Sequence, residues 1–242
     1  MRTYFLRLNA FAKSFILLLR PHLFFGFLKN PFLFLSNTLA LSQWIAKQQP
    51  LLTNDFYTPF RDHNRRYNLF TQVIDYAALQ QKKIAYLEFG VSQAHSFTWW
   101  LKNNGHAESR FHGFDTFEGL PEQWGTFAKG AMAAGIPRVD DQRAFFYPGL
   151  FQHTVPAFLK ETDLSDAAIR VIHLDADLFS ATLFALTSLA PYLKKGDILF
   201  FDEFNVPNHE FHAFQLFCSS YYLEFELLGA VNNYYQVAFV LK

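Results

Sequence analysis

The sequence predicts an α/β fold: a Rossmann-like, doubly wound and mostly parallel seven-stranded sheet, with an antiparallel C-terminal hairpin and an α-helical N-terminal extension. Two observations carry this prediction. From Ile84 onward, short apolar runs alternate with helix-like segments, which is typical of a parallel sheet covered on both faces. Near the end of the chain, Asn232-Asn233 separates two strand-like runs, and such a turn readily joins antiparallel strands.

Each expected strand is a short apolar run, and most of the parallel ones end beside an acidic residue or glycine. The parallel strands are expected at residues 84–90, 110–115, 144–150, 169–175 and 197–202, and the hairpin strands at 222–228 and 234–241. Leucines recur at helical spacing from Leu183 to Leu193, so residues 180–193 are expected to form a crossover helix that stops before Gly196. A second helix is expected over residues 209–220.

The composition indicates one sizeable core and no nucleic-acid partner. The chain has 242 residues, of which 51% are hydrophobic, and this is far from the composition of a disordered protein. Its formal net charge is zero, whereas binding to nucleic acid normally needs a basic face. Cys218 has no partner for a disulfide, so we expect a reducing, cytoplasmic compartment.

Residues 1–68 differ in pattern from residues 69–242 and are expected to form a separate helical extension. Basic residues punctuate its apolar stretches: Arg2, Arg7, Lys13, Arg20 and Lys29. No stretch is cleanly long enough to span a membrane. Two roles stay open, an interfacial helix on a membrane surface, or a lid or dimer contact that covers these apolar faces. The expectations are therefore peripheral membrane contact through this segment and a homodimer.

Polar residues at the ends of the first two strands predict a nucleoside site. In an open parallel sheet, ligands bind at the carboxyl ends of strands where the strand order reverses. Gly90 allows close backbone approach there, and Glu88 offers an acceptor to an ammonium or hydroxyl group. Asp115 ends the second strand, where an acid commonly binds ribose hydroxyls. Taken singly, each residue also suits a turn or a helix cap.

Four carboxylates at the ends of two later strands predict a cation. Asp175 and Asp177 follow one buried apolar strand, and Asp202 and Glu203 follow the next. Without compensation these groups would repel one another and lose hydration, so a cation between them is the natural remedy. Hard carboxylate oxygens select Mg²⁺, Mn²⁺ or Ca²⁺ over zinc. His173 is expected to satisfy a hydrogen bond in the core rather than to bind metal.

These motifs resemble those of the macrocin O-methyltransferase family, also called the TylF family, which includes sugar O-methyltransferases of macrolide and aminocoumarin biosynthesis. The resemblance spans residues 84–217 and rests on the blocks EFGV at 88–91, GFDTFEGLP at 113–121, LDADL at 174–178 and FDE at 201–203. Gly149 with the segment 154–156 is similar to the family's connection after the third strand. Glu203 stands where the family usually has Asp, and Ala94 where it tends to have Gly.

The resemblance implies that residues 69–242 form an S-adenosylmethionine-dependent O-methyltransferase domain acting on a small-molecule hydroxyl, such as that of a sugar or glycosylated natural product. It implies Mg²⁺ (or Mn²⁺) held by Asp175, Asp202 and Glu203, with Asp177 as general base. The expected cofactor-binding residues are Glu88, Gly90, Val91, Ser96, Asp115, Thr116, Gly149 and Asp175. Residues 118–143, rich in glycine, are assigned to a mobile loop that binds the acceptor.

Two other functions stay open. A metal-dependent glycosyltransferase also places Asp-x-Asp after an apolar strand to hold a nucleotide sugar, which Asp175 and Asp177 alone do not exclude. A non-catalytic, membrane-associated scaffold with a methyltransferase fold is the second alternative, because folds are reused without their chemistry. Binding of S-adenosylhomocysteine or of a nucleoside diphosphate would distinguish them.

Overall fold

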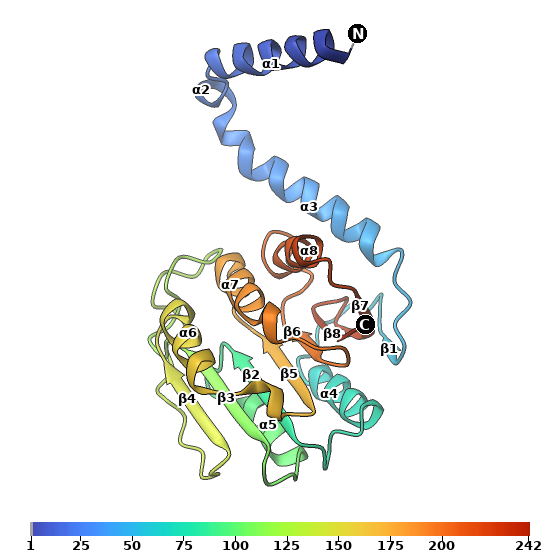
Figure 1. Cartoon of the computed structure of the whole chain (residues 1–242), viewed down its shortest axis with the longest axis vertical. Coiled ribbons are helices and arrows are strands. Elements are labelled where there is room, and N and C mark those ends of the chain that lie inside the picture. Colours follow the sequence, from blue (N-terminus) through green and yellow to red (C-terminus); the bar gives the residue numbers. More distant parts are fainter. Residues whose placement is uncertain (1) are drawn as a thin grey trace.

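An open mixed sheet forms the centre of the molecule (Figure 1), and a computed structural model describes it for residues 2–242, with side chains from Tyr4 on. The strands are β1 (Thr53–Asn54), β2 (Ile84–Phe89), β3 (Arg110–Asp115), β4 (Ala144–Pro148), β5 (Ile169–Leu174), β6 (Ile198–Phe201), β7 (Phe225–Val231) and β8 (Gln236–Leu241). Their order is β1-β7-β8-β6-β5-β2-β3-β4. All pairs are parallel except those that β8 makes with β6 and β7. The predicted fold class is confirmed.

The sheet has eight strands rather than the predicted seven. The additional strand, β1, is only two residues long and pairs with β7 at the edge, Thr53 with Gly229. So short a strand has no alternation to detect in sequence. The first hairpin strand begins at Phe225, three residues later than predicted, because Tyr222 adopts a left-handed conformation (φ 54°) that caps the preceding helix.

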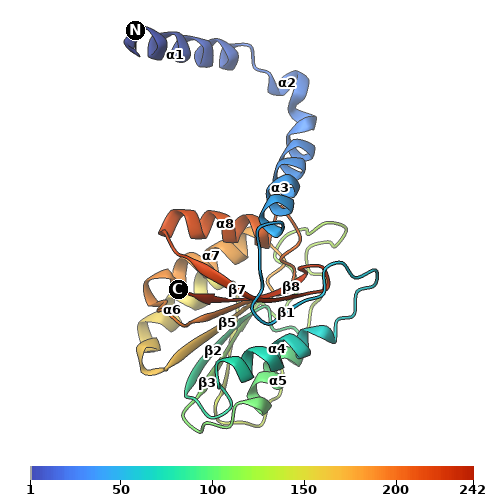
Figure 2. The same cartoon turned by 90° about the vertical axis from the view of Figure 1, so that its right-hand side faces the viewer.

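Helices cover both faces of the sheet (Figure 2). On one face lie α4 (Arg65–Tyr76) and α5 (His95–Asn103), and on the other α6 (Phe151–Glu161), α7 (Phe179–Leu189) and α8 (Glu210–Tyr221). Short 3₁₀ turns lie at Leu164–Asp166 and at Ala190–Tyr192, where Pro191 follows α7. Because each face of the sheet is covered, β2, β5 and β6 are buried almost throughout.

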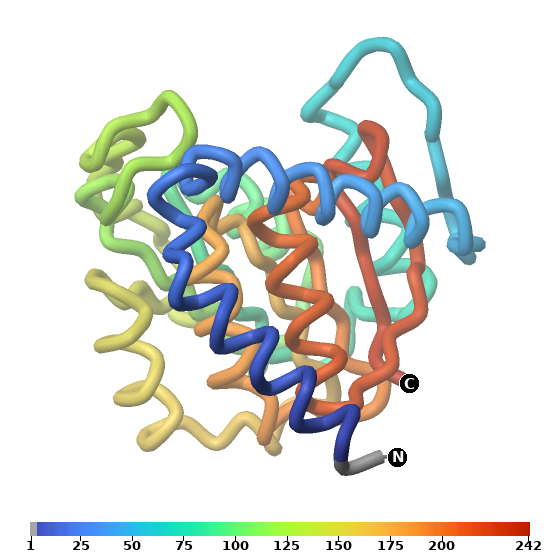
Figure 3. Tube along the Cα trace, turned by 90° about the horizontal axis from the view of Figure 1, so that it is seen from above, coloured from blue at the N-terminus to red at the C-terminus, as the bar shows by residue number. Residues whose placement is uncertain are grey.

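The N-terminal helices rise away from this domain. They are α1 (Arg2–Leu18), α2 (His22–Phe25), a 3₁₀ turn (Gly26–Leu28) and α3 (Lys29–Ile45). Only the C-terminal part of α3 reaches the domain, beside α8 and the sheet edge, and Figure 3 shows α1 crossing above α8. Among the described residues no single helix is long and apolar enough to cross a membrane. Taken together, the segments Tyr4–Leu18 and His22–Ile45, which are bent relative to each other, have the length and composition of a membrane span.

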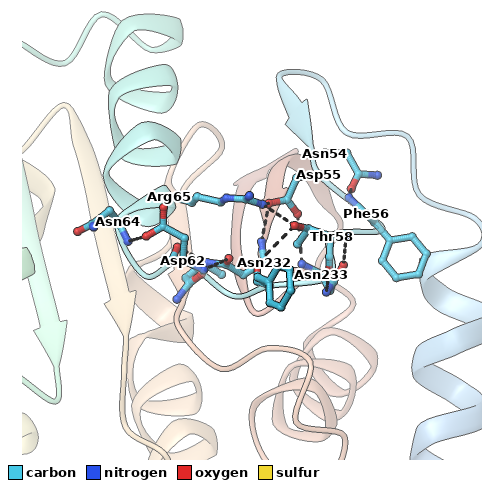
Figure 4. Close-up of polar contacts among 11 residues, drawn as sticks. Asn54, Asp55, Phe56, Thr58, Asp62, Asn64, Arg65, Asn232 and Asn233 are labelled. Atoms are coloured by element: carbon cyan, nitrogen blue, oxygen red, sulfur yellow. Dashed lines mark hydrogen bonds and ion pairs between the residues drawn. The ribbon is translucent and has the colours of Figure 1, made fainter.

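A polar network ties the segment between α3 and α4 to the turn that joins β7 and β8 (Figure 4). Asp55 accepts from the backbone N–H groups of Asn232 (2.9 Å) and Asn233 (3.2 Å), and from Arg65 at 2.6 Å. The Asn233 side chain exchanges two hydrogen bonds with the backbone of Thr58. The network therefore fixes residues 55–65 against the carboxyl edge of the sheet.

Candidate functional site

One cavity of about 360 Å³ lies at the carboxyl ends of the central parallel strands. The strand ends contribute the polar part of its lining: Gly90, Asp115, Thr116, Asp175, Asp177, Asp202 and Glu203. Leu120, Pro121, Trp124 and Met132 add an apolar wall from the loop after β3. His63, Arg66 and Tyr235 contribute from the opposite edge, and the starts of α6 and α7 add Phe151, Gln152, Ser180 and Ala181. The cavity thus lies where ligands bind in open α/β sheets.

The turn after β2 depends on glycine. Gly90 has φ +92°, and a Cβ atom there would lie 1.8 Å from the carbonyl oxygen of Asp175. No other residue fits this approach, so Gly90 sets the spacing between the ends of β2 and β5. Ala94 adopts a left-handed conformation (φ 60°) before α5, the position where the TylF pattern has glycine. Alanine meets the same backbone requirement there at some cost in strain.

Asp115 clamps this turn. Its Oδ2 accepts from the N–H groups of Val91 and Ser92, each at 2.8 Å, and its Oδ1 accepts from Phe117 at 2.7 Å. The carboxylate faces the cavity while it holds the backbone of the turn. Each carboxylate oxygen has two acceptor positions, so Oδ2 is fully used by the backbone while Oδ1 keeps one position for a ligand hydroxyl.

Glu88 lies beneath the cavity rather than on its lining. Its side chain is fully buried, and the Tyr86 hydroxyl donates to Glu88 Oε2 at 2.6 Å. Burial raises the pKa of Glu88 to about 8, so the carboxyl group is largely protonated at neutral pH. His173 is buried beside it, with Nδ1 3.1 Å from the same Tyr86 hydroxyl. Burial lowers the pKa of His173 to about 3, so its imidazole is neutral.

The acid cluster, which comprises Asp175, Asp177, Asp202 and Glu203, is held in a poorly solvated place. Burial raises the pKa of Asp175 well above its usual value, with further contributions from the charges of Asp202 and Asp177. Burial also raises the pKa of Asp202 and of Glu203. The pKa of Asp177 rises to about 7, through burial first and then through Glu203 and Asp202. A carboxylate with a pKa near 7 suits a general base at neutral pH.

Arg66, from the first turn of α4, supplies a cation to this cluster. Its Nη2 lies 3.0 Å from Asp202 Oδ2, and its Nη1 lies 3.9 Å from Asp175 Oδ2. The positive guanidinium therefore offsets part of the negative charge of two carboxylates. It lowers the pKa of Asp202, although burial has the larger, opposite effect. Sequence reasoning missed this residue because Arg66 lies more than a hundred residues before both acids. The run Arg61 to Arg66, rich in cations and adjacent to an amphipathic helix, was the available signal.

The donor set of the cluster fits a hard divalent cation. Asp202 Oδ1 and Glu203 Oε2 are buried and have no hydrogen-bond partner within the described chain. Ligand atoms of His173, Asp175 and Asp202 lie within 4.8 Å of one another. The other oxygen of Glu203, Oε1, accepts from the Tyr235 hydroxyl. Two orphaned oxygens facing one cavity are the kind of site that a cation satisfies, with Arg66 as the competing positive charge.

A long loop between β3 and β4 covers one side of the cavity. Trp124 stacks on Phe127 with ring centroids 5.3 Å apart, and their backbones form an isolated bridge. Glu122 accepts from Ser180 of α7 at 3.2 Å, which links the loop to the far wall. Apart from such contacts, residues 116–143 have little regular structure, so the loop is positioned by a few side chains.

The structure brings most of the predicted site residues to one cavity but not all. Glu88, Val91 and Ser96 are buried behind the lining, and Ser96 is only 4% exposed in α5. Gly149 lines a neighbouring depression that shares Thr116 and Leu150 with the cavity. Asp115, Asp175, Asp177, Asp202 and Glu203 converge as the strand-end argument expected.

Comparisons with known proteins find similarity to methyltransferases. A family model described as a methyltransferase domain matches residues 87–204. The fold is similar to that of CalS11, a calicheamicin methyltransferase, at a TM-score of 0.59 and 20% identity over 85% of this chain and 91% of that one. It is also similar to the O-methyltransferase NovP, at a TM-score of 0.55 and 17% identity over 73% of this chain and 79% of that one.

An apo structure of CalS11, described as a TDP-rhamnose 3'-O-methyltransferase, matches at a TM-score of 0.53 and 19% identity over 85% and 93% of the two chains. No curated protein sequence matches. The chain thus shares its fold with these methyltransferases, and the segment matched by the methyltransferase domain model, residues 87–204, contains the glycine turn, Asp115 and the acid cluster.

Proposed function

We propose that this protein is an O-methyltransferase of the TylF type, which transfers a methyl group from S-adenosylmethionine to a hydroxyl of a small molecule, a sugar or glycosylated natural product, with Mg²⁺ or Mn²⁺ as metal. The observation that carries the proposal is the convergence of Gly90, Asp115 and the acid cluster on one cavity. The methyltransferase domain match over the same residues supports methyl transfer over glycosyl transfer. A homodimer stays a prediction.

Two ends of the cavity have different roles in this proposal. Gly90 and Asp115 lie at the end formed by β2 and β3, where Asp115 would accept from a ribose hydroxyl and Gly90 would let the cofactor approach the backbone. Asp177 would accept the proton of the acceptor hydroxyl as the oxygen attacks the methyl group. Trp124 and Leu120 would exclude water from the reacting oxygen.

A divalent ion would be held by Asp175, Asp202 and Glu203. It would lower the pKa of the acceptor hydroxyl when bound. Glu203 presents its unpartnered Oε2 to the site while Tyr235 holds the other oxygen. The ion and the Arg66 guanidinium would compete for the Asp202 carboxylate.

Thermal unfolding of the full chain with ligands tests the proposal. S-adenosylhomocysteine with Mg²⁺ should stabilise the protein, by about 2.7 kcal/mol when the ligand is at a hundred times its Kd. Asp115→Ala should weaken this shift, whereas Asp140→Ala, an exposed acid outside the cavity, should keep it. A larger shift with a nucleoside diphosphate would favour the glycosyltransferase. No shift with either ligand would favour the non-catalytic scaffold.

A further inference from the structure

The N-terminal helices expose an unusual amount of apolar surface. Every residue from Tyr4 to Arg20 is exposed, and the large apolar side chains of this stretch are 49% to 81% exposed. The exposed set continues through α2, the 3₁₀ turn and α3: Leu23, Phe24, Phe25, Phe27, Phe32, Leu33, Phe34, Leu35 and Leu39. Soluble monomers rarely leave a contiguous apolar surface of this extent, so it calls for a partner.

Helix α1 has the pattern of a helix that lies at an interface. Tyr4, Leu8, Phe11, Phe15 and Leu18 recur at intervals of four and three residues and therefore share one face. Phe11 and Phe15 stack there, with ring centroids 6.3 Å apart. The opposite face is mixed and carries Asn9 and Lys13 together with Leu6 and Leu17. From such a helix the aromatic and aliphatic side chains can enter the acyl boundary of a bilayer while the long basic side chains reach the headgroups.

All charged residues of the N-terminal region are basic. Residues 1–54 contain Lys and Arg but no Asp or Glu. Because the formal net charge of the chain is zero, the remaining residues carry an equal excess of acid. None of Arg7, Lys13 and Arg20 forms a salt bridge within the described chain. An anionic surface would attract the helices and repel the body of the domain, which fixes an orientation.

The C-terminal half of α3 packs on the domain and holds the exposed helices away from it. Trp44 packs among Phe204, Phe211 and Tyr234, with ring centroids 5.2 to 6.0 Å away. Asn37, which is buried, donates to the Asn208 side chain at 2.9 Å. Figures 1 and 2 show α3 as a stem above the domain and α1 running across its far end. Because the C-terminal half of α3 is fixed to the domain, the full length of α1 lies away from the sheet.

We propose that α1, α2 and the projecting half of α3 dock the protein on the surface of an anionic lipid bilayer, with α1 in the plane of the interface. A span is disfavoured because α1 is about 25 Å long, short of a hydrocarbon core of about 30 Å. A broken span would also place Arg20 and His22 within the bilayer. Symmetric pairing with a second copy would bring like-charged helices together.

Vesicle sedimentation of the full chain tests this proposal. Binding should be at least about tenfold stronger to phosphatidylcholine vesicles that contain phosphatidylserine than to phosphatidylcholine alone, and it should weaken with salt. Arg7→Glu, Lys13→Glu and Arg20→Glu combined should abolish the preference. The matched control changes Lys102, Lys160 and Lys195, exposed lysines of the body, to Glu, and should leave the preference intact.

A second pair of variants tests the apolar face. Phe11→Ser with Phe15→Ser should reduce vesicle binding by more than about tenfold. Phe60→Ser with Tyr222→Ser removes side chains that are 80% and 92% exposed on the body and should leave binding unchanged. S-adenosylhomocysteine binding by the same variants is read separately, so a failure of the proposed function does not affect this test.

Three outcomes would overturn the docking proposal. One is a stable dimer that does not bind vesicles and that the Phe11→Ser and Phe15→Ser changes dissociate. This result would assign the apolar surface to contact with a second copy of the chain. Another is resistance of the bound protein to alkaline carbonate extraction, which would indicate a span. The third is equal loss of vesicle binding in the body control and the α1 variant.

Discussion

The acid cluster and the N-terminal helices place side chains in opposite kinds of unfavourable surroundings. The cluster buries Asp202 and Glu203 and half-buries Asp175 and Asp177, whereas α1 exposes aromatic and aliphatic side chains that a core would bury. Each costs free energy in the isolated chain, by lost hydration in the first region and by exposed apolar area in the second. Each region therefore lacks a partner in the isolated chain, and we propose a cation with ligands for the first and a lipid surface for the second.

The largest expected effect concerns Asp177 of the acid cluster. Asp177→Asn keeps the shape of the side chain but removes the base, so the methyl-transfer rate should fall by about 10² to 10⁴. Phe11→Ser with Phe15→Ser, at the other region, should leave the rate on a soluble acceptor unchanged. Single-turnover rates with labelled S-adenosylmethionine check both. Equal rates for Asp177→Asn and the unaltered protein would remove Asp177 from this role.

The next effect compares the same residue type in the two environments. Phe239 is 1% exposed and packs against Phe201, Phe204 and Phe214, so Phe239→Ala should lower the free energy of unfolding by about 3 to 5 kcal/mol. Phe15 is 49% exposed, and Phe15→Ala should cost less than about 0.5 kcal/mol in the absence of lipid. Denaturant unfolding measures both. Similar costs would mean that α1 packs against protein in solution.

A buried titratable group outside both regions gives a pH prediction. Burial lowers the pKa of His112 from 6.5 to about 4, so its neutral form is favoured in the folded protein. The stability that this group contributes, about 3 kcal/mol, is present above pH 6.5 and is lost as the pH falls through about 4. In His112→Asn, which keeps a polar partner for Tyr147, unfolding free energy should depend less steeply on pH over this window. An unchanged slope would contradict it.

The smallest expected effect tests how the acid cluster is compensated. Arg66→Met removes the guanidinium that contacts Asp202 and should tighten Mn²⁺ binding by about tenfold, the effect of removing one competing ion pair. Arg65→Met, whose side chain pairs with Asp55 instead, is the matched control and should not tighten it. Titration calorimetry with the metal alone measures the affinity. Weaker binding in Arg66→Met would mean that Arg66 supports the metal rather than competes with it.

Local patterns were enough to predict most of the sheet and the convergence of acids on its edge. Strand ends of a parallel sheet meet at one edge, so Asp115, Asp175 and Asp202 could be brought together without coordinates. The boundaries failed where a single residue decides them. Tyr222 ends α8 in a left-handed conformation, which the neighbouring sequence does not predict. Strand β1 forms by pairing with the edge strand β7, a contact between distant parts of the chain.

What the sequence determined by itself was therefore the periodicity, the acid positions and the unbalanced basic charge of residues 1–54. Only the tertiary structure decided that Arg66 reaches Asp202, that Asp115 holds the backbone of the Gly90 turn, and that Glu88 lies beneath the cavity. The physical reason is that periodicity reports which face of an element is buried, whereas side-chain pairings across distant elements depend on packing that no local pattern records.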